Sequence, residues 1–77
     1  TGTVTEYVAE AIGCTGPVLT VSTACSSGAV ALKVALELIR SGKASRVLAG
    51  GADSLTRLTY YGFSLLKLID PDGTHPF

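Results

Sequence analysis

One long apolar stretch, residues 25–40, most limits what this chain can fold into. Apolar side chains recur there at the three- and four-residue spacing of a helix face. Lys33, Glu37 and Arg40 form the single polar face of the stretch. A helix with so little polar surface is mostly buried in a folded protein. The pattern therefore predicts a mostly buried helix over residues 25–40.

Short apolar segments precede and follow this helix. Residues 18–22 are rich in β-branched side chains and follow a proline, which is typical of a strand. Residues 46–49 are apolar and too few for a helix, which is typical of a buried parallel strand. Strand, helix and strand in this order predict an α/β fold with a right-handed βαβ unit. Further helices are expected over residues 5–12, ended by Gly13, and over residues 56–68.

Size and charge exclude several classes of protein. The chain has 77 residues, enough for a single module, and 47% of them are hydrophobic. Its six acidic and six basic residues are scattered singly and give a net charge of zero. A surface for nucleic acid or for an anionic membrane needs clustered Lys and Arg, so we expect neither partner. No apolar run in the sequence is long enough to span a bilayer.

The two cysteines, Cys14 and Cys25, indicate neither a disulfide framework nor a metal site. They lie eleven residues apart, and the one histidine, His75, is distant from both, which is not a metal-ligand spacing. Sparse, unpaired cysteines are typical of a reducing compartment, so the cytoplasm is the expected location. We expect no metal and no cofactor.

The turn between the first predicted strand and the long helix places Cys25 where a nucleophile is useful. Unpaired backbone N–H groups and the positive end of the helix macrodipole meet at that point. They stabilise a thiolate, and they can hold the oxyanion that develops on a thioester carbonyl. A strand-to-helix turn that presents a nucleophile recurs in acyl transfer. On chemistry alone, a small buried cysteine that only packs remains an equal alternative.

The segment Val-Ser-Thr-Ala-Cys-Ser-Ser-Gly, residues 21–28, closely resembles the nucleophile motif of β-ketoacyl synthases, the condensing enzymes of fatty-acid and polyketide assembly. Residues 46–53 resemble the next strand and diglycine turn of that family. Residues 62–77, which contain Gly-Phe, Pro-Asp-Gly and Pro-Phe, resemble the helix and loop beyond. The resemblance implies that residues 1–77 are a fragment from the N-terminal half of a synthase domain with the layered, thiolase-like α/β/α/β/α fold.

The resemblance also implies an activity, that of a 3-oxoacyl-[acyl carrier protein] synthase. Cys25 would take an acyl group from an acyl carrier protein, with its own backbone N–H as one oxyanion donor. Malonyl-[acyl carrier protein] then loses carbon dioxide, and the carbanion attacks the acyl group. Phe63, and Thr59 one turn earlier, resemble residues of the acyl pocket, although core packing explains Phe63 equally well. The family implies a homodimer, in which residues 18–22 pair antiparallel with their copy.

The two catalytic histidines of the family lie in a later region, and His75 matches neither of them. His75 stands where the family commonly has Arg before Pro-Phe, so residues 1–77 alone are expected to be inactive. The absence of Met and the end on Thr-His-Pro-Phe also indicate a fragment. Three alternatives remain: another thiolase-fold acyltransferase such as a thiolase or a CoA-using ketosynthase, a non-catalytic partner subunit, and an α/β module whose helix 25–40 caps an anion.

Overall fold

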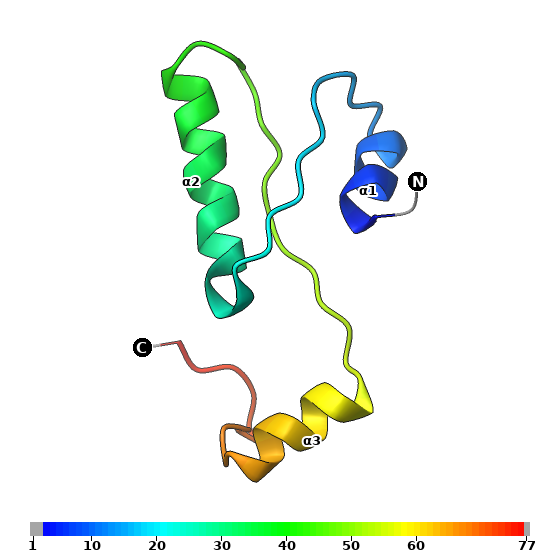
Figure 1. Ribbon diagram of the computed structural model, residues 1–77, viewed down its shortest axis with the longest axis vertical. Coiled ribbons are helices and arrows are strands. Elements are labelled where there is room, and N and C mark those ends of the chain that lie inside the picture. Colours follow the sequence, from blue (N-terminus) through cyan, green and yellow to red (C-terminus); the bar gives the residue numbers. More distant parts are fainter. Residues whose placement is uncertain (1–2, 77) are drawn as a thin grey trace.

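The computed structural model describes residues 3–76 and shows helices joined by long irregular segments (Figure 1). Phe77, the last residue of the predicted Pro-Phe match, lies outside the described residues. In order along the described chain, the elements are α1 (Val4–Ala11), the 3-10 helix η1 (Ala24–Ser26), α2 (Ser27–Arg40) and α3 (Arg57–Leu65). The predicted helix at 25–40 is confirmed as η1 followed directly by α2. The three α-helices stand apart from one another in Figure 1.

Threonine side chains explain where α1 and α3 begin. Thr3 Oγ1 accepts a hydrogen bond of 3.1 Å from the backbone N–H of Glu6, and Thr56 Oγ1 accepts one of 3.1 Å from the N–H of Thr59. Both threonines have extended backbone, as N-cap residues do. Each helix therefore starts within one residue of its predicted position. A bond of 2.9 Å from Thr20 Oγ1 to Thr5 Oγ1 joins α1 to the segment that leads to η1.

All three α-helices end in the Schellman motif, a pair of backbone hydrogen bonds that closes the last turn. In each, the first residue after the C-cap donates to a carbonyl three residues back, and the next residue donates to one five residues back. The first of these residues is Gly13 in α1, Gly42 in α2 and Lys67 in α3, with φ of +72°, +76° and +57°. The motif at Lys67 ends α3 at Leu65, so the prediction of a helix to residue 68 was too long.

Neither predicted strand is assigned within residues 3–76. Residues 18–22 and 46–49 run without regular structure (Figure 1), and the backbone hydrogen bonds outside the described helices are those of turns and caps. A strand exists only when its N–H and C=O groups pair with a neighbouring strand. These two segments do not pair with each other, so the βαβ unit is not confirmed.

Among the described residues no apolar side chain is buried, so these residues form no hydrophobic core. The radius of gyration is 15.6 Å, whereas a compact chain of this length has about 11.5 Å. The accessible surface is 6978 Å², against about 4,400 Å² for a folded monomer of the same mass. Leu32, predicted to be buried on α2, is 61% exposed. The α2 helix forms as predicted, but its burial is not seen in this structure.

Of the helices in the described part of the chain, none combines the length and the apolar character that a membrane span requires.

Candidate active site

Cys25 lies at the centre of η1, in the sharp turn that leads into α2. Its thiol is free and exposed. The residue before it, Ala24, has φ of +54°, in the left-handed region that residues with a side chain rarely adopt. The chain thus reverses direction directly before the cysteine. This geometry matches the predicted turn that presents a nucleophile, except that the segment entering it is not a paired strand.

Two serine hydroxyls bond back onto this turn. Ser27 Oγ accepts a hydrogen bond of 2.8 Å from the backbone N–H of Thr23 and donates one of 2.7 Å to the carbonyl oxygen of Ala24. Ser26 Oγ donates to the carbonyl oxygen of Thr23 at 2.8 Å and lies 3.0 Å from the Thr23 hydroxyl. The residues on both sides of Cys25 are therefore tied together by side chains as well as by backbone.

The backbone N–H of Cys25 takes part in none of the turn and cap hydrogen bonds found among residues 3–76. The N–H of Ser26, by contrast, donates to the carbonyl of Thr23 at 3.3 Å, and that of Ser27 donates to the carbonyl of Ala24. The first N–H groups of a helix have no acceptor in the preceding turn and can bind a ligand oxygen. The Cys25 N–H is thus available to donate to an atom outside the chain.

An open hollow of about 600 Å³ lies against the turn. Its lining residues come from the segment before η1, from the start of α2 and from the segment after the diglycine: Val21, Ser22, Ala24, Cys25, Ser27, Gly28, Gly51, Ala52 and Asp53. A Cβ added at Gly51 would lie 4.0 Å from the Cα of Gly28, so the diglycine segment passes close to the first turn of α2. The structure therefore brings together two of the three segments that the sequence analysis singled out.

The two predicted pocket residues, Thr59 and Phe63, lie one turn apart on α3, and neither lines the hollow at Cys25. The hydroxyl of Thr59 accepts a hydrogen bond of 2.9 Å from Thr56 Oγ1, next to the N-cap bond that starts the helix. Phe63 is 44% exposed. The assignment of both residues to an acyl pocket stays a prediction.

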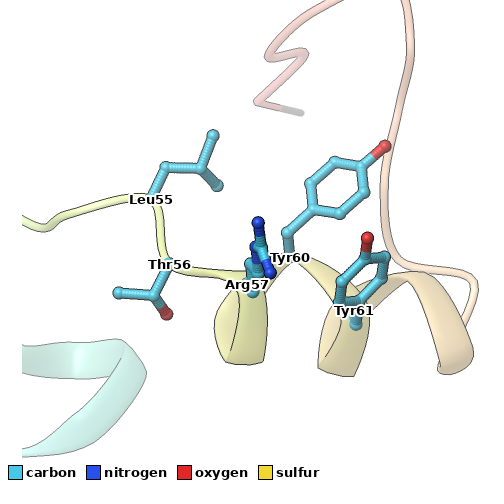
Figure 2. A pocket seen from close by; sticks show the side chains of 5 residues that line it. All are labelled: Leu55, Thr56, Arg57, Tyr60 and Tyr61. Atoms are coloured by element: carbon cyan, nitrogen blue, oxygen red, sulfur yellow. The ribbon is translucent and has the colours of Figure 1, made fainter.

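A second, smaller hollow of about 230 Å³ lies at the start of α3 (Figure 2). It is lined by Leu55, Thr56, Arg57, Tyr60 and Tyr61. The two tyrosine rings meet edge to face, with their centroids 5.6 Å apart and an angle of 76° between their planes. These side chains include no cysteine, no histidine and no carboxylate, so the Cys25 hollow remains the candidate site.

The remaining histidine and cysteine have other local partners. Nδ1 of His75 lies 2.7 Å from Oδ2 of Asp70, whose other carboxylate oxygen accepts a hydrogen bond of 2.8 Å from the N–H of Asp72. No imidazole lines the hollow at Cys25 in the described residues. The backbone N–H of Cys14 closes the Schellman motif of α1, and its thiol is exposed.

Sequence analysis did not predict the bonding roles of Ser26 and Ser27 or the position of Asp53. It considered the two serines only as part of the motif over residues 21–28. Their spacing of three and four residues after Thr23 is typical of hydroxyl groups that bond back to a turn, and this signal could have found them. Asp53 reaches the hollow by a contact between distant parts of the chain, for which no local pattern exists.

Comparison with known proteins gives the family. The model of the "Beta-ketoacyl synthase, N-terminal domain" family matches residues 2–77. The chain belongs to the β-ketoacyl synthase family. The predicted resemblance is thereby confirmed, and membership implies a thiolase-like fold. The matched region of this β-ketoacyl synthase chain contains the turn at Cys25, the diglycine segment and α3.

Several relatives are 40% or more identical to this β-ketoacyl synthase chain over the aligned residues. Pikromycin polyketide synthase component PikAII of Streptomyces venezuelae is 43% identical over 86% of the chain and 2% of its own length. Non-reducing polyketide synthase AC of Didymella fabae is 40% identical over 86% of the chain and 2% of its own length. Putative polyketide beta-ketoacyl synthase 1 of Streptomyces halstedii is 40% identical over 96% of the chain and 18% of its own length. The chain thus spans a small part of each relative. No solved structure matches it.

Proposed function

We propose that this chain is the nucleophile-bearing part of a condensing enzyme, with residues 1–77 in the N-terminal half of a β-ketoacyl synthase domain. The observation that carries the proposal is the setting of Cys25. Its thiol is exposed, it opens a long helix, and it faces an open hollow beside an N–H group without a partner in the turn. The family match over residues 2–77 supports a nucleophilic role for Cys25 in this setting.

The first step is acyl transfer to Cys25. The thiolate attacks the carbonyl carbon of an acyl thioester on the acyl carrier protein, and the carbonyl oxygen gains negative charge. The N–H of Cys25 donates to this oxyanion, and the positive end of the α2 macrodipole lies on the same side. When the tetrahedral intermediate collapses, the carbon–sulfur bond to the carrier breaks, and the carrier thiolate leaves and takes up a proton. The acyl group is then held on Cys25.

The second step is a decarboxylative condensation. Malonyl-[acyl carrier protein] loses carbon dioxide, and the electrons of the broken bond form a carbanion at the α-carbon. The carbanion attacks the acyl carbonyl, the bond to Cys25 breaks, and the 3-oxoacyl product stays on the carrier. No histidine lines the hollow among residues 3–76, so we assign the decarboxylation to groups outside this chain. Relatives named as polyketide synthases support polyketide assembly as the pathway.

Replacement of Cys25 in the complete synthase tests the proposal. We expect Cys25→Ala to lower the condensation rate by roughly a thousandfold or more, because the acyl group then has no attachment point. Decarboxylation of malonyl-[acyl carrier protein] should persist, since it does not need the thiol. Cys14→Ala is the matched control and should condense at the wild-type rate. Mass spectrometry of a trapped acyl-enzyme should find the acyl group on the peptide that contains Cys25. A Cys25→Ala enzyme that condenses as fast as wild type would contradict the assignment.

A further inference from the structure

We propose that Ser27 is a positioning residue that holds Cys25 in place by fixing the left-handed backbone of Ala24. The inference rests on the proposed function of Cys25 as the nucleophile and adds to it. Ser27 Oγ spans the turn: it accepts from the N–H of Thr23 at 2.8 Å and donates to the carbonyl of Ala24 at 2.7 Å. We call this pair of hydrogen bonds the Ser27 bridge.

The Ser27 bridge holds the groups whose rotation would let the turn relax. The Thr23 N–H lies before the residue with φ of +54°, and the Ala24 carbonyl belongs to the peptide bond that carries the N–H of Cys25. A residue with a Cβ is strained in this conformation and keeps it only when its surroundings impose it. Without the bridge, the Ala24 carbonyl keeps only the backbone N–H of Ser27 as a donor, so less holds Ala24 against a return to negative φ. That change would rotate the peptide bond between Ala24 and Cys25, and it would move the Cys25 N–H and thiol together.

The hydroxyl of Ser27 is not placed to act on the substrate itself. Its one proton is donated to the carbonyl of Ala24, and an oxygen lone pair is used by the N–H of Thr23. A hydroxyl has one donor proton, so Ser27 has none left for a reacting group while the bridge is formed. Its effect on the reaction therefore passes through the position of Cys25.

Ser26 supplies a matched control in the same turn. Its hydroxyl bonds to the carbonyl of Thr23 at 2.8 Å and lies 3.0 Å from the Thr23 hydroxyl, so it holds the peptide group before Ala24, whereas Ser27 holds the one after it, which carries the Cys25 N–H. Ser26→Ala and Ser27→Ala each remove one hydroxyl group, and the two residues are adjacent. Only Ser27→Ala removes a bond to the strained residue.

The test measures acyl transfer to Cys25 in the complete synthase. We expect Ser27→Ala to slow acyl transfer about tenfold at saturating acyl thioester, the factor that corresponds to about 1.4 kcal/mol. The KM for the acyl thioester should change little, because the hydroxyl of Ser27 is engaged within the turn although the residue lines the hollow. Ser26→Ala should have a distinctly smaller effect. Ser27→Thr, which keeps the hydroxyl, should retain more of the rate than Ser27→Ala.

A second substitution separates positioning from general loss of folding. Glycine adopts positive φ without strain, so Ala24→Gly should restore most of the lost rate when it is added to Ser27→Ala. If Ser27 only stabilised the fold, glycine at position 24 would not restore the rate of acyl transfer. The inference is overturned if Ser27→Ala and Ser26→Ala slow acyl transfer equally, or if Ala24→Gly restores nothing. If Cys25→Ala itself proves fully active, the proposed function fails as well, so the two failures are distinguishable.

Discussion

Two exposed cysteines of this chain occupy opposite helix ends. Cys25 lies just before α2, at the end where N–H groups and the positive pole of the macrodipole meet. Cys14 closes the Schellman motif of α1, at the end where carbonyl groups and the negative pole meet. As a general rule, the N-terminal end of a helix favours negative charge nearby and the C-terminal end favours positive charge. Because both thiols are accessible, access does not explain a difference in their reactivity.

Brief alkylation of the complete synthase should therefore label Cys25 first. We expect iodoacetamide at neutral pH to react with Cys25 about tenfold faster than with Cys14, in line with the size of helix-end effects on charge. Mass spectrometry of the two peptides after a short reaction measures both rates in one sample. Label that accumulates mainly on Cys14 would show that the turn does not activate Cys25.

Cys25 could be proposed as the nucleophile from the sequence, whereas the backbone conformation of its turn could not be predicted. A cysteine at the start of an apolar helix is visible in the order of residues, and the motif around it is specific. The positive φ of Ala24 cannot be predicted from the sequence, since alanine is not a residue that favours this conformation. The spacing of Ser27 after Thr23 is compatible with a hydroxyl that bonds back to the turn, but its bond to the carbonyl of a residue with positive φ is seen only in the structure.

At the scale of elements, the helices were predictable because their signals are local. Glycine after α1 and after α2 marks the end of each helix, and the structure places Gly13 and Gly42 with positive φ. The end of α3 was missed because Lys67 fills the same position and its residue type gives no warning. The strands were not confirmed, because strand pairing depends on partners elsewhere in a sheet.

The strained end of α3 gives a stability prediction. Lys67→Gly should stabilise the complete protein by roughly 0.5–1 kcal/mol, because it removes the strain of a side chain at φ of +57°. Glycine also makes the unfolded chain more flexible, which disfavours folding, but this effect is smaller. The reverse change at the end of α2, Gly42→Ala, should destabilise by about 1 kcal/mol. Urea unfolding of both variants measures the free energies. A Lys67→Gly protein less stable than wild type would argue against the strain.

At the scale of the whole molecule, the main feature is uncovered surface. The chain exposes 6978 Å², about 2,600 Å² more than a compact monomer of its mass. Apolar faces of α2 and α3 and the unpaired segment 18–22 contribute to it. An apolar segment with unpaired backbone groups is normally covered in a mature protein. We propose that a second copy of the synthase covers residues 18–22.

A proline at Val21 tests this homodimer. Val21 lies in the segment 18–22 and also lines the hollow at Cys25. Val21→Pro removes one backbone N–H from the proposed ladder, so dimerisation and condensation should both be largely lost. Val21→Ala keeps the N–H and is the control, which should remain a dimer. Light scattering gives the oligomeric state, and an assay of condensation gives the activity. A monomeric Val21→Pro enzyme with full activity would exclude this pairing.

The hydrogen bonds that close the helices and the Ser27 bridge join residues close together in the sequence. This closeness determines how early they can form during synthesis of the chain. The bonds that close the three helices span at most five residues, and the Ser27 bridge spans four. Such local contacts form within about microseconds, whereas the ribosome adds roughly 5–20 residues each second. The turn that carries Cys25 can therefore take shape as soon as it emerges. The proposed pairing of residues 18–22 with a second copy needs contact between two chains, so it would follow the formation of this turn.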